Sequence, residues 1–497
     1  MFKNIIGSHK PDILDCISNL SSDEVFTPPS VVKTMLDQLP EVLWSNPSLT
    51  FLDPSTKSGV FLREIAKRLM AGLQDVIVDE DERRNHIFSK MVFGYAITDL
   101  TGNIARRTLY YTKAANSENS VVKFDSPQGN IRYVRSNHNY MKGRCLQCGA
   151  PEGSLDRGDS LENYAYHFIH SSEVNKMKFD VIIGNPPYQL EDDGYGNSSL
   201  PIFQHFVNQA ISLEPKYLSM IIPARWYSGG KGLDDFRRQM IQDRNIKTLI
   251  DFPKLFDCFP GVEIKGGVCI FLRESGYNGN CLVKTVIEGE VISESVRDLR
   301  DGGDVLIRSN FGVPILKKVQ AKKEQTLDSV VSSRKPFGLS TTDVGTDKPT
   351  TKDALVLYRR GGKGFISKSK ITANTENIGK WKVYTAKAGD GHGRVPMIVS
   401  GEPIIGEPES VCSETYLVAC FFDTESEANN FAHFLRSKFC RFLISLRKNT
   451  QQVTKDVFGF VPVLSHKTKW TDKKLYERYG FDLNEIEHIE STIREMV

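Results

Sequence analysis

The chain has 497 residues, of which 40% are hydrophobic and 25% are charged, so its length and composition suit a globular protein of two or three domains. No stretch approaches the roughly 18 uninterrupted apolar residues of a membrane span, and the first ten residues, MFKNIIGSHK, lack the features of a signal peptide. We therefore expect a cytoplasmic protein with no membrane partner. Its nine cysteines, an odd number in a long chain, are expected to be reduced thiols.

The first 275 residues alternate between apolar runs of strand length and stretches of helical character. The expected strands are residues 49–53, 91–97, 179–184, 217–222 and 246–251, followed by a hairpin-like pair across 261–272. The expected helices are residues 30–39, with Ser30 as the N-cap, and residues 60–70, 202–211 and 233–242. Such alternation predicts an α/β domain built on a parallel sheet.

The remaining residues, 276–497, have a different character. Short strand-like segments are separated by Gly, Ser, Thr and Lys, and the last 28 residues are predicted to be helical. Residues 332–394 carry 13 Lys and Arg against 5 Asp and Glu. This local positive charge fits a domain that binds a polyanion, although an ordinary basic surface would have the same composition. We expect a smaller mixed C-terminal domain with a helical end.

The most informative stretch is FDVIIGNPPY, residues 179–188, in which a buried strand ends in Asn185, Pro186, Pro187 and Tyr188. Ligands of open parallel sheets bind beyond the carboxyl ends of the strands. Two prolines fix the backbone and leave carbonyls that can accept hydrogen bonds. An amide oxygen beside a bare carbonyl suits an uncharged amino group, and Tyr188 offers a flat face to a ring that bears it. The alternative is a rigid turn.

These four residues resemble the catalytic motif of amino-directed methyltransferases, above all the S-adenosylmethionine-dependent DNA adenine-N6 methyltransferases. Release-factor glutamine methyltransferases and some guanine-N2 RNA methyltransferases carry the tetrapeptide too. For a DNA enzyme the resemblance implies that the target base leaves the duplex stack. It also implies a Rossmann-like fold for residues 1–275.

Residues 51–62, FLDPSTKSGVFL, resemble the cofactor loop of the same family, with Asp53, Pro54, Ser55 and Gly59 matching. Glycine allows close backbone approach, and the helix amides that follow can face a ligand. Lys57 stands where the family often has its first glycine, which implies a less tight turn or a lysine directed at solvent.

Three further contacts to the cofactor follow from the resemblance. Thr27 and Pro28, in a Thr-Pro loop, are expected near its methionine end. Asp99 is the nearest acid after the second strand for the ribose hydroxyls, and a helix N-cap would explain it equally well. Asp159 or the region of His170 remains open as the adenine contact.

Residues 257–272 resemble the late motif that supplies a second aromatic ring to the flipped base. Phe259 is the matching position, and a core phenylalanine is the alternative. Arg225 and Trp226 could also line this cleft. The order of motifs resembles the gamma class of DNA adenine methyltransferases of restriction–modification systems, which have the target-recognition domain last. In that domain Arg359, Arg360 and Lys382 are the expected contacts to the DNA backbone.

Residues 113–160 form a polar insertion that contains Cys145 and Cys148 in a CxxC pattern. This spacing predicts half of a structural zinc site, with His138, His167 and His170 as candidates for the other ligands. Two unpaired thiols in a turn are the alternative.

The sequence thus predicts a site-specific DNA adenine-N6 methyltransferase that binds S-adenosylmethionine and duplex DNA, with any restriction endonuclease on a separate chain. The alternatives are an RNA or protein (glutamine) amino-methyltransferase and a non-enzymatic zinc-containing DNA-binding protein.

Overall fold

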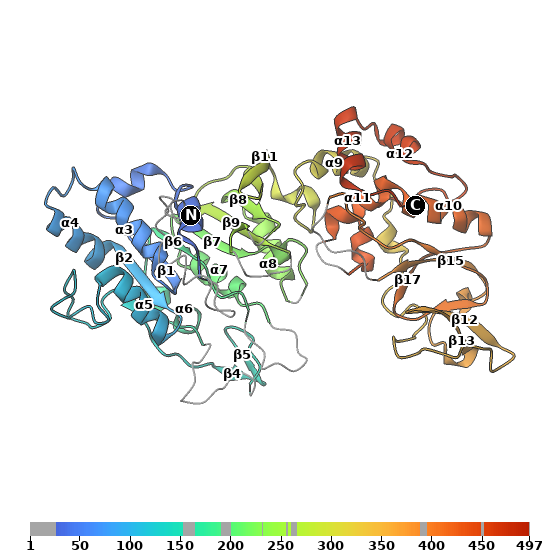
Figure 1. Ribbon diagram of the computed structural model, residues 1–497, viewed down its shortest axis with the longest axis horizontal. Coiled ribbons are helices and arrows are strands. Elements are labelled where there is room, and N and C mark those ends of the chain that lie inside the picture. Colours follow the sequence, from blue (N-terminus) through green and yellow to red (C-terminus); the bar gives the residue numbers. More distant parts are fainter. Residues whose placement is uncertain are drawn as a thin grey trace, which may run out of the picture. The chain divides into compact units, whose positions relative to one another are not determined.

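The computed structural model describes residues 26–152, 165–189, 200–230, 232–254, 257–259, 266–387, 395–448 and 452–496. The chain divides into two compact units, the first ending at Leu299 and the second beginning at Arg300 (Figure 1). None of the helices in the described ranges is both long and apolar enough to cross a membrane.

The first unit is built on a nine-stranded sheet with the strand order β11-β10-β8-β9-β7-β6-β1-β2-β3. The strands are β1 (Phe51–Thr56), β2 (Val92–Ala96), β3 (Ile131–Arg132), β6 (Val181–Gly184), β7 (Tyr217–Pro223), β8 (Ile246–Phe252), β9 (Val268–Glu274), β10 (Cys281–Ile287) and β11 (Glu290–Arg297). Strands β3, β2, β1, β6 and β7 run parallel, and β9 is antiparallel to both of its neighbours. The predicted α/β class is confirmed. Of the hairpin-like pair predicted across 261–272, residues 261–265 lie outside the described residues, and β9 pairs with β7 and β8.

Helices cover this sheet, and its inner strands β1, β6 and β7 are buried along their whole length. They are α2 (Pro29–Leu36), α3 (Val60–Gly72), α4 (Glu80–His86), α5 (Asp99–Tyr110), α6 (His167–His170), α7 (Phe203–Ser212) and α8 (Asp234–Gln242). Alternate residues of neighbouring strands, Phe51 of β1 with Val181 and Ile183 of β6, share one hydrophobic cluster with α2, α3 and α5. In Figure 1, α3 and α5 lie beside β1 and β2, which they contact.

The N-cap of helix α2 lies two residues before the N-cap that the sequence predicts. Pro28 is the N-cap and Pro29 the first helical residue, whereas Ser30 lies inside the helix and is exposed. Proline suits the first helical position because its fixed φ is helical and it lacks an N–H that would need a partner. The carbonyl of Pro28 accepts hydrogen bonds from the amides of Val31 and Val32. The assignment of Ser30 as the cap was therefore wrong.

The first unit extends to Leu299, beyond the boundary predicted at residue 275. Strand β10 pairs in parallel with β8, and β11 pairs antiparallel with β10 at the edge of the same sheet. These backbone hydrogen bonds attach residues 281–297 to the first unit.

The predicted insertion, 113–160, divides between two structures. Strand β3 joins the edge of the main sheet beside β2, while β4 (Tyr140–Met141) and β5 (Arg144–Cys145) form a separate antiparallel pair.

The second unit contains two three-stranded sheets and a group of helices. One sheet has the order β13-β12-β16 and the other β15-β14-β17. Their bounds are β12 (Ala354–Arg359), β13 (Gly362–Ser367), β14 (Trp381–Ala386), β15 (Ile404–Gly406), β16 (Ser410–Cys412) and β17 (Tyr416–Phe422). The helices are α9 (Gly312–Gln320), α10 (Glu425–Arg436), α11 (Lys438–Arg447), α12 (Asp472–Tyr479) and α13 (Leu483–Thr492). The predicted mixed character and helical end are confirmed.

Candidate active site at the carboxyl ends of the strands

The parallel strands bring the predicted site residues to one edge of the sheet. Because Leu52 of β1 is in register with Ile182 of β6, Asp53 and Gly184 emerge close together. A Cβ atom added to Gly184 would lie 2.8 Å from Oδ1 of Asp53, so the strands approach here as closely as glycine allows. The cofactor loop and the Asn-Pro-Pro-Tyr loop are therefore neighbours.

Asn185 is held at this edge by the Thr-Pro loop. Its side chain is 2% exposed, and its Nδ2 donates a hydrogen bond of 3.0 Å to Oγ1 of Thr27, which is 4% exposed. The two residues are 158 positions apart in the chain. Thr27 directly precedes the capping residue of α2, and α2 packs against α3, so the packing of α2 carries Thr27 to Asn185.

The end of β1 and the loop that follows it are buried, and local hydrogen bonds shape the end of the strand. The amide of Ser55 donates to Oδ1 of Asp53 at 3.1 Å, and Oγ1 of Thr56 donates to the carbonyl oxygen of Asp53 at 3.1 Å. Gly59 ends the loop with φ of 77°, a left-handed conformation that favours glycine, at the N-terminus of α3. A Cβ atom there would lie 3.0 Å from Cα of Ala105 on α5, so close packing also requires glycine.

A small pocket opens between these loops. It is lined by residues of the Thr-Pro loop, the loop after β1, the first turn of α3 and the Asn-Pro-Pro-Tyr loop: Thr27, Asp53, Ser55, Lys57, Ser58, Gly59, Val60, Phe61 and Asn185. The sequence had identified Thr27, Asp53, Ser55, Gly59 and Asn185 but not the other four. The whole span from 53 to 61 could have been included, because a loop between a buried strand and a buried helix faces the same space.

The expectation that Lys57 is directed at solvent is wrong. It is 8% exposed and contributes to the pocket wall. Its positive charge lowers the pKa of the Asp53 carboxyl, but burial acts more strongly in the other direction and raises that pKa from 3.8 to about 7.

Asp99 lies at the same edge of the sheet, after β2, but its side chain is exposed and accepts a hydrogen bond from Asn103 within α5. Thr98 is the N-cap of α5 and forms a reciprocal capping box with Thr101. The alternative interpretation of Asp99 as the helix cap is therefore wrong. Asp159 lies outside the described residues.

The aromatic residues expected to hold a base are closer to the core than predicted. Phe259 is 2% exposed and belongs to the hydrophobic cluster against which Tyr188 packs. Burial raises the pKa of the Tyr188 phenol, with smaller contributions from the nearby thiols of Cys258 and Cys269. In this conformation Phe259 lies in the core, as its alternative interpretation as a core phenylalanine predicts.

The two residues after β7 differ from each other. Trp226 is fully buried and donates from Nε1 to Sγ of Cys269 at 3.4 Å, so it does not line a cleft. Arg225 is only half-buried at the carboxyl end of β7, next to β6 in the sheet.

The three residues predicted to contact the DNA backbone have different environments in the second unit. Lys382 is 0% exposed, and its Nζ donates to the carbonyl oxygens of Ile378 and Ser410, each at 2.8 Å. Lys382 cannot reach a phosphate, so that prediction was wrong. Arg359 is half-buried and pairs with Asp347 at 2.7 Å, whereas Arg360, at the turn between β12 and β13, is exposed.

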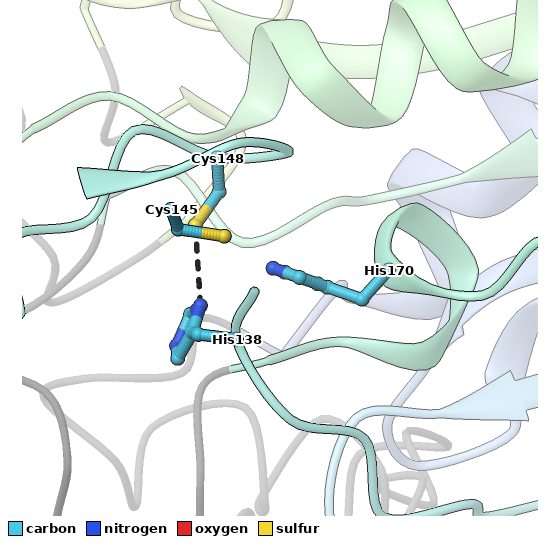
Figure 2. Close-up of side chains that lie close together, drawn as sticks. All are labelled: His138, Cys145, Cys148 and His170. Carbon is cyan, nitrogen blue, oxygen red and sulfur yellow. Dashed lines mark hydrogen bonds between the residues drawn. The ribbon is translucent and has the colours of Figure 1, made fainter. Parts of the chain in front are cut away.

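The insertion brings Cys145 and Cys148 together with two of the three candidate histidines (Figure 2). His138 and His170 lie with the two thiols. His167 does not, because its Nδ1 is hydrogen-bonded to Oγ of Ser136 at 3.0 Å and its ring packs against Tyr95.

Comparison with known proteins shows two relatives by sequence, a family of methylases and one bacterial protein. Residues 90–259 match the family model described as the Eco57I restriction-modification methylase. A protein of Mycoplasma pneumoniae described as an uncharacterized adenine-specific methylase is 40% identical over 370 residues, which span 66% of this chain and 88% of that protein.

Solved structures of restriction–modification proteins are also similar. The M protein of the type I restriction enzyme EcoKI matches with a TM-score of 0.35 and 15% identity, over 55% of this chain and 50% of that one. The type IIL enzyme MmeI in complex with DNA matches with a TM-score of 0.46 and 12% identity, over 86% of this chain and 65% of that one. The identity to the Mycoplasma protein, together with the family match across the Asn-Pro-Pro-Tyr loop, shows that this chain belongs to the adenine-specific methylases of the restriction–modification type.

Proposed function

We propose that this protein transfers a methyl group from S-adenosylmethionine to N6 of an adenine in duplex DNA, as a site-specific DNA-methyltransferase (adenine-specific). In a restriction–modification system it would supply the modification activity, with the endonuclease on a separate chain. The observation that carries the proposal is the hydrogen bond between Asn185 and Thr27 at the pocket that Asp53 and Gly59 also line.

Asn185 and Pro186 are proposed to orient the adenine amine. The amide oxygen of Asn185 and the backbone carbonyl of Pro186 would accept its two hydrogens, which directs the nitrogen lone pair toward the methyl donor. The hydrogen bond from Nδ2 of Asn185 to Oγ1 of Thr27 holds the side chain at the edge of the pocket. N6 gains the methyl group and releases one proton to water, so the residues act mainly by positioning.

The chemistry of the pocket lining suits the polar and positively charged part of S-adenosylmethionine. Asp53 would supply a carboxylate, and the first turn of α3, which follows Gly59, also lines the space. When bound, the cofactor supplies an electrophilic methyl group on a sulfonium. Thr27, Pro28, Pro54 and Ser55 would complete the contacts around it, with Asp99 reaching the ribose hydroxyls from the first turn of α5.

Tyr188 and Phe259 are proposed to stack on the flipped adenine. Pro187 fixes the backbone between Asn185 and Tyr188 and thereby the spacing between amine and ring contacts. Stacking on Phe259 requires its ring to turn out of the hydrophobic cluster that now covers it. Flipping costs a few kcal/mol, and the two ring contacts would offset part of that cost.

In the second unit, Arg360 is proposed to contact the DNA backbone. It is exposed on the turn that ends β12, and the side chain of Arg359 beside it is held by Asp347. Arg359 would therefore reach a phosphate only by exchanging this partner.

The activity is tested with tritiated S-adenosylmethionine and three acceptors: mixed-sequence duplex DNA, total RNA and a glutamine-containing peptide. Nucleoside analysis of the labelled DNA should show N6-methyladenine. Label confined to RNA would mark an RNA methyltransferase, label confined to the peptide a glutamine methyltransferase, and DNA binding without label a non-enzymatic DNA-binding protein. Each of these three results would contradict the proposal.

A further inference from the structure

Four side chains with metal-binding atoms meet beside the β4–β5 pair. They are His138, ahead of β4; Cys145, in β5; Cys148, in the following turn; and His170, at the end of α6. One ligand atom from each lies within 4.8 Å of the others, and both sulfur atoms and one nitrogen of each ring face a common centre (Figure 2). Sγ of Cys148 is 3.5 Å from Nδ1 of His138.

His170 has the orientation of a metal ligand. Its Nδ1 is 2.9 Å from the carbonyl oxygen of Tyr166, and because a carbonyl only accepts, Nδ1 carries the hydrogen. Nε2 therefore bears a lone pair. This atom is buried, has no hydrogen-bond partner among the described residues and points toward the two sulfurs (Figure 2). Metal-bound histidines are commonly fixed by such a hydrogen bond from the opposite ring nitrogen.

The two cysteines lie in a tight turn that presents both thiols on one side. The amide of Cys145 donates to the carbonyl of Ala150 at 2.8 Å, and the amide of Gly149 donates to the carbonyl of Cys145 at 2.9 Å. Gly149 has φ of 73° with open space around its Cα, so glycine is needed there for backbone conformation alone. Both cysteine side chains are 3% exposed.

We propose that His138, Cys145, Cys148 and His170 bind one structural zinc ion. Tetrahedral zinc with bonds of about 2.3 Å to sulfur and about 2.0–2.1 Å to nitrogen needs ligand atoms roughly 3.3–3.8 Å apart. A contraction of about 1 Å converts the present cluster to that geometry. Two thiolates balance the charge of Zn²⁺ in this buried place, and four protein ligands leave no open position for catalysis.

The zinc would attach the insertion to the methyltransferase unit. His138, Cys145 and Cys148 belong to the insertion, whereas His170 belongs to α6. Helix α6 packs on α7 through Phe168 and Phe206, whose rings are stacked at 5.8 Å. The chain then continues from α6 into β6 and the Asn-Pro-Pro-Tyr loop. The metal is thus a cross-link near the catalytic loop that takes no part in methyl transfer.

The proposal is tested by the metal content of the purified full-length protein, measured by elemental mass spectrometry after growth with added zinc. We expect one zinc per chain in the wild type. Cys145→Ser, Cys148→Ser and His170→Ala should each retain less than about a tenth of that amount after brief chelation. His167→Gln is the matched control, because this histidine lies on the same helix but outside the cluster, and it should keep its zinc.

Cobalt exchange into the wild type keeps the test decisive if the variants fail to fold. Tetrahedral Co²⁺ with thiolate ligands gives intense visible bands and a sulfur charge-transfer band, and these are the expected result. A folded wild type without stoichiometric zinc that also gives no such bands would overturn the proposal. Retention of zinc in His170→Ala with loss in His167→Gln would overturn the assigned ligands.

Discussion

Asn185 is the residue on which the proposed chemistry depends. Asn185→Ala removes the amide that would hold the adenine amine, and we expect kcat to fall by roughly 100-fold or more. The affinity for S-adenosylhomocysteine, measured by calorimetry, should change little. Thr27→Ser is the control, because a serine hydroxyl can still accept the hydrogen bond from Asn185, and this variant should keep most of its activity. Equal kcat for Asn185→Ala and the wild type would contradict the role.

Because burial raises the pKa of Asp53, the stability of the folded protein should depend on pH in a direction that can be stated. Its pKa is about 7 in the folded protein and 3.8 without the environment of the fold. Between pH 4 and 7 the unfolded chain releases this proton while the folded chain keeps it, so the contribution of Asp53 to stability falls as the pH rises and levels off above pH 7. Asp53→Asn removes the titration. Its melting temperature relative to the wild type should therefore rise from pH 4 to pH 7, and a constant difference between the two proteins would contradict the shift.

Arg359 and Arg360 are adjacent, but only Arg360 is expected to contribute strongly to DNA binding. Arg360→Gln should weaken binding to mixed-sequence duplex and reduce the slope of log affinity against log salt by about 1. Arg359→Gln is the matched control, because its side chain already pairs with Asp347, and it should leave that slope nearly unchanged. Fluorescence anisotropy across a salt series measures both. Identical slopes for Arg360→Gln and the wild type would argue against the contact.

At the scale of single elements, the turn from β1 into α3 requires glycine at position 59 for both its backbone conformation and its packing. Gly59→Ala places a Cβ atom at positive φ and 3.0 Å from Ala105, so we expect the free energy of unfolding to fall by roughly 1–3 kcal/mol. Because the same turn lines the pocket, affinity for S-adenosylhomocysteine should fall as well.

Gly276→Ala provides the comparison for this prediction. Gly276 has φ of 84°, but open space surrounds its Cα. The variant should lose some stability in thermal melting and keep its affinity for S-adenosylhomocysteine. Unchanged affinity in Gly59→Ala as well would show that the turn does not form part of the cofactor site.

Much of the first unit could be predicted because buried parallel strands are short apolar runs. Strands β2, β6, β7 and β8 overlap such runs, and helices α7 and α8 begin within one residue of the predicted starts. Strand β1 extends to Thr56, beyond the run predicted at 49–53. The edge strand β11 could not be recognised in the same way, because most of its side chains are exposed and carry no strong pattern. The boundary at 275 was placed too early for this reason.

The meeting of Asp53 and Asn185 was predictable, because carboxyl ends of parallel strands share one edge. Thr27 instead precedes α2, and the packing of that helix places it beside Asn185. The burial of individual side chains could not be predicted from the sequence. Lys382 belongs to a basic segment, yet packing of β14 turns it inward to two backbone carbonyls. The choice of His170 over His167 depends on which side of α6 faces the insertion, and sequence spacing does not contain that information.

At the scale of the whole molecule, the two units have separate hydrophobic clusters. The cluster that surrounds β1 and β6 draws on residues between 31 and 286, and the two clusters of the second unit draw on residues between 305 and 493. Each unit therefore has hydrophobic packing of its own. The proposed tasks, transfer of the methyl group in the first unit and DNA binding in the second, match this division.

The central claim is that Asn185 and its loop direct methylation to the N6 amine of adenine in DNA. The most direct measurement is mass spectrometry of nucleosides from the chromosomal DNA of cells that lack other adenine methylases and produce either this protein or Asn185→Ala. We predict N6-methyladenine with the wild type and none above background with the variant at equal protein levels. Unmodified adenine with a well-expressed wild type, or equal amounts of N6-methyladenine with both proteins, would contradict it.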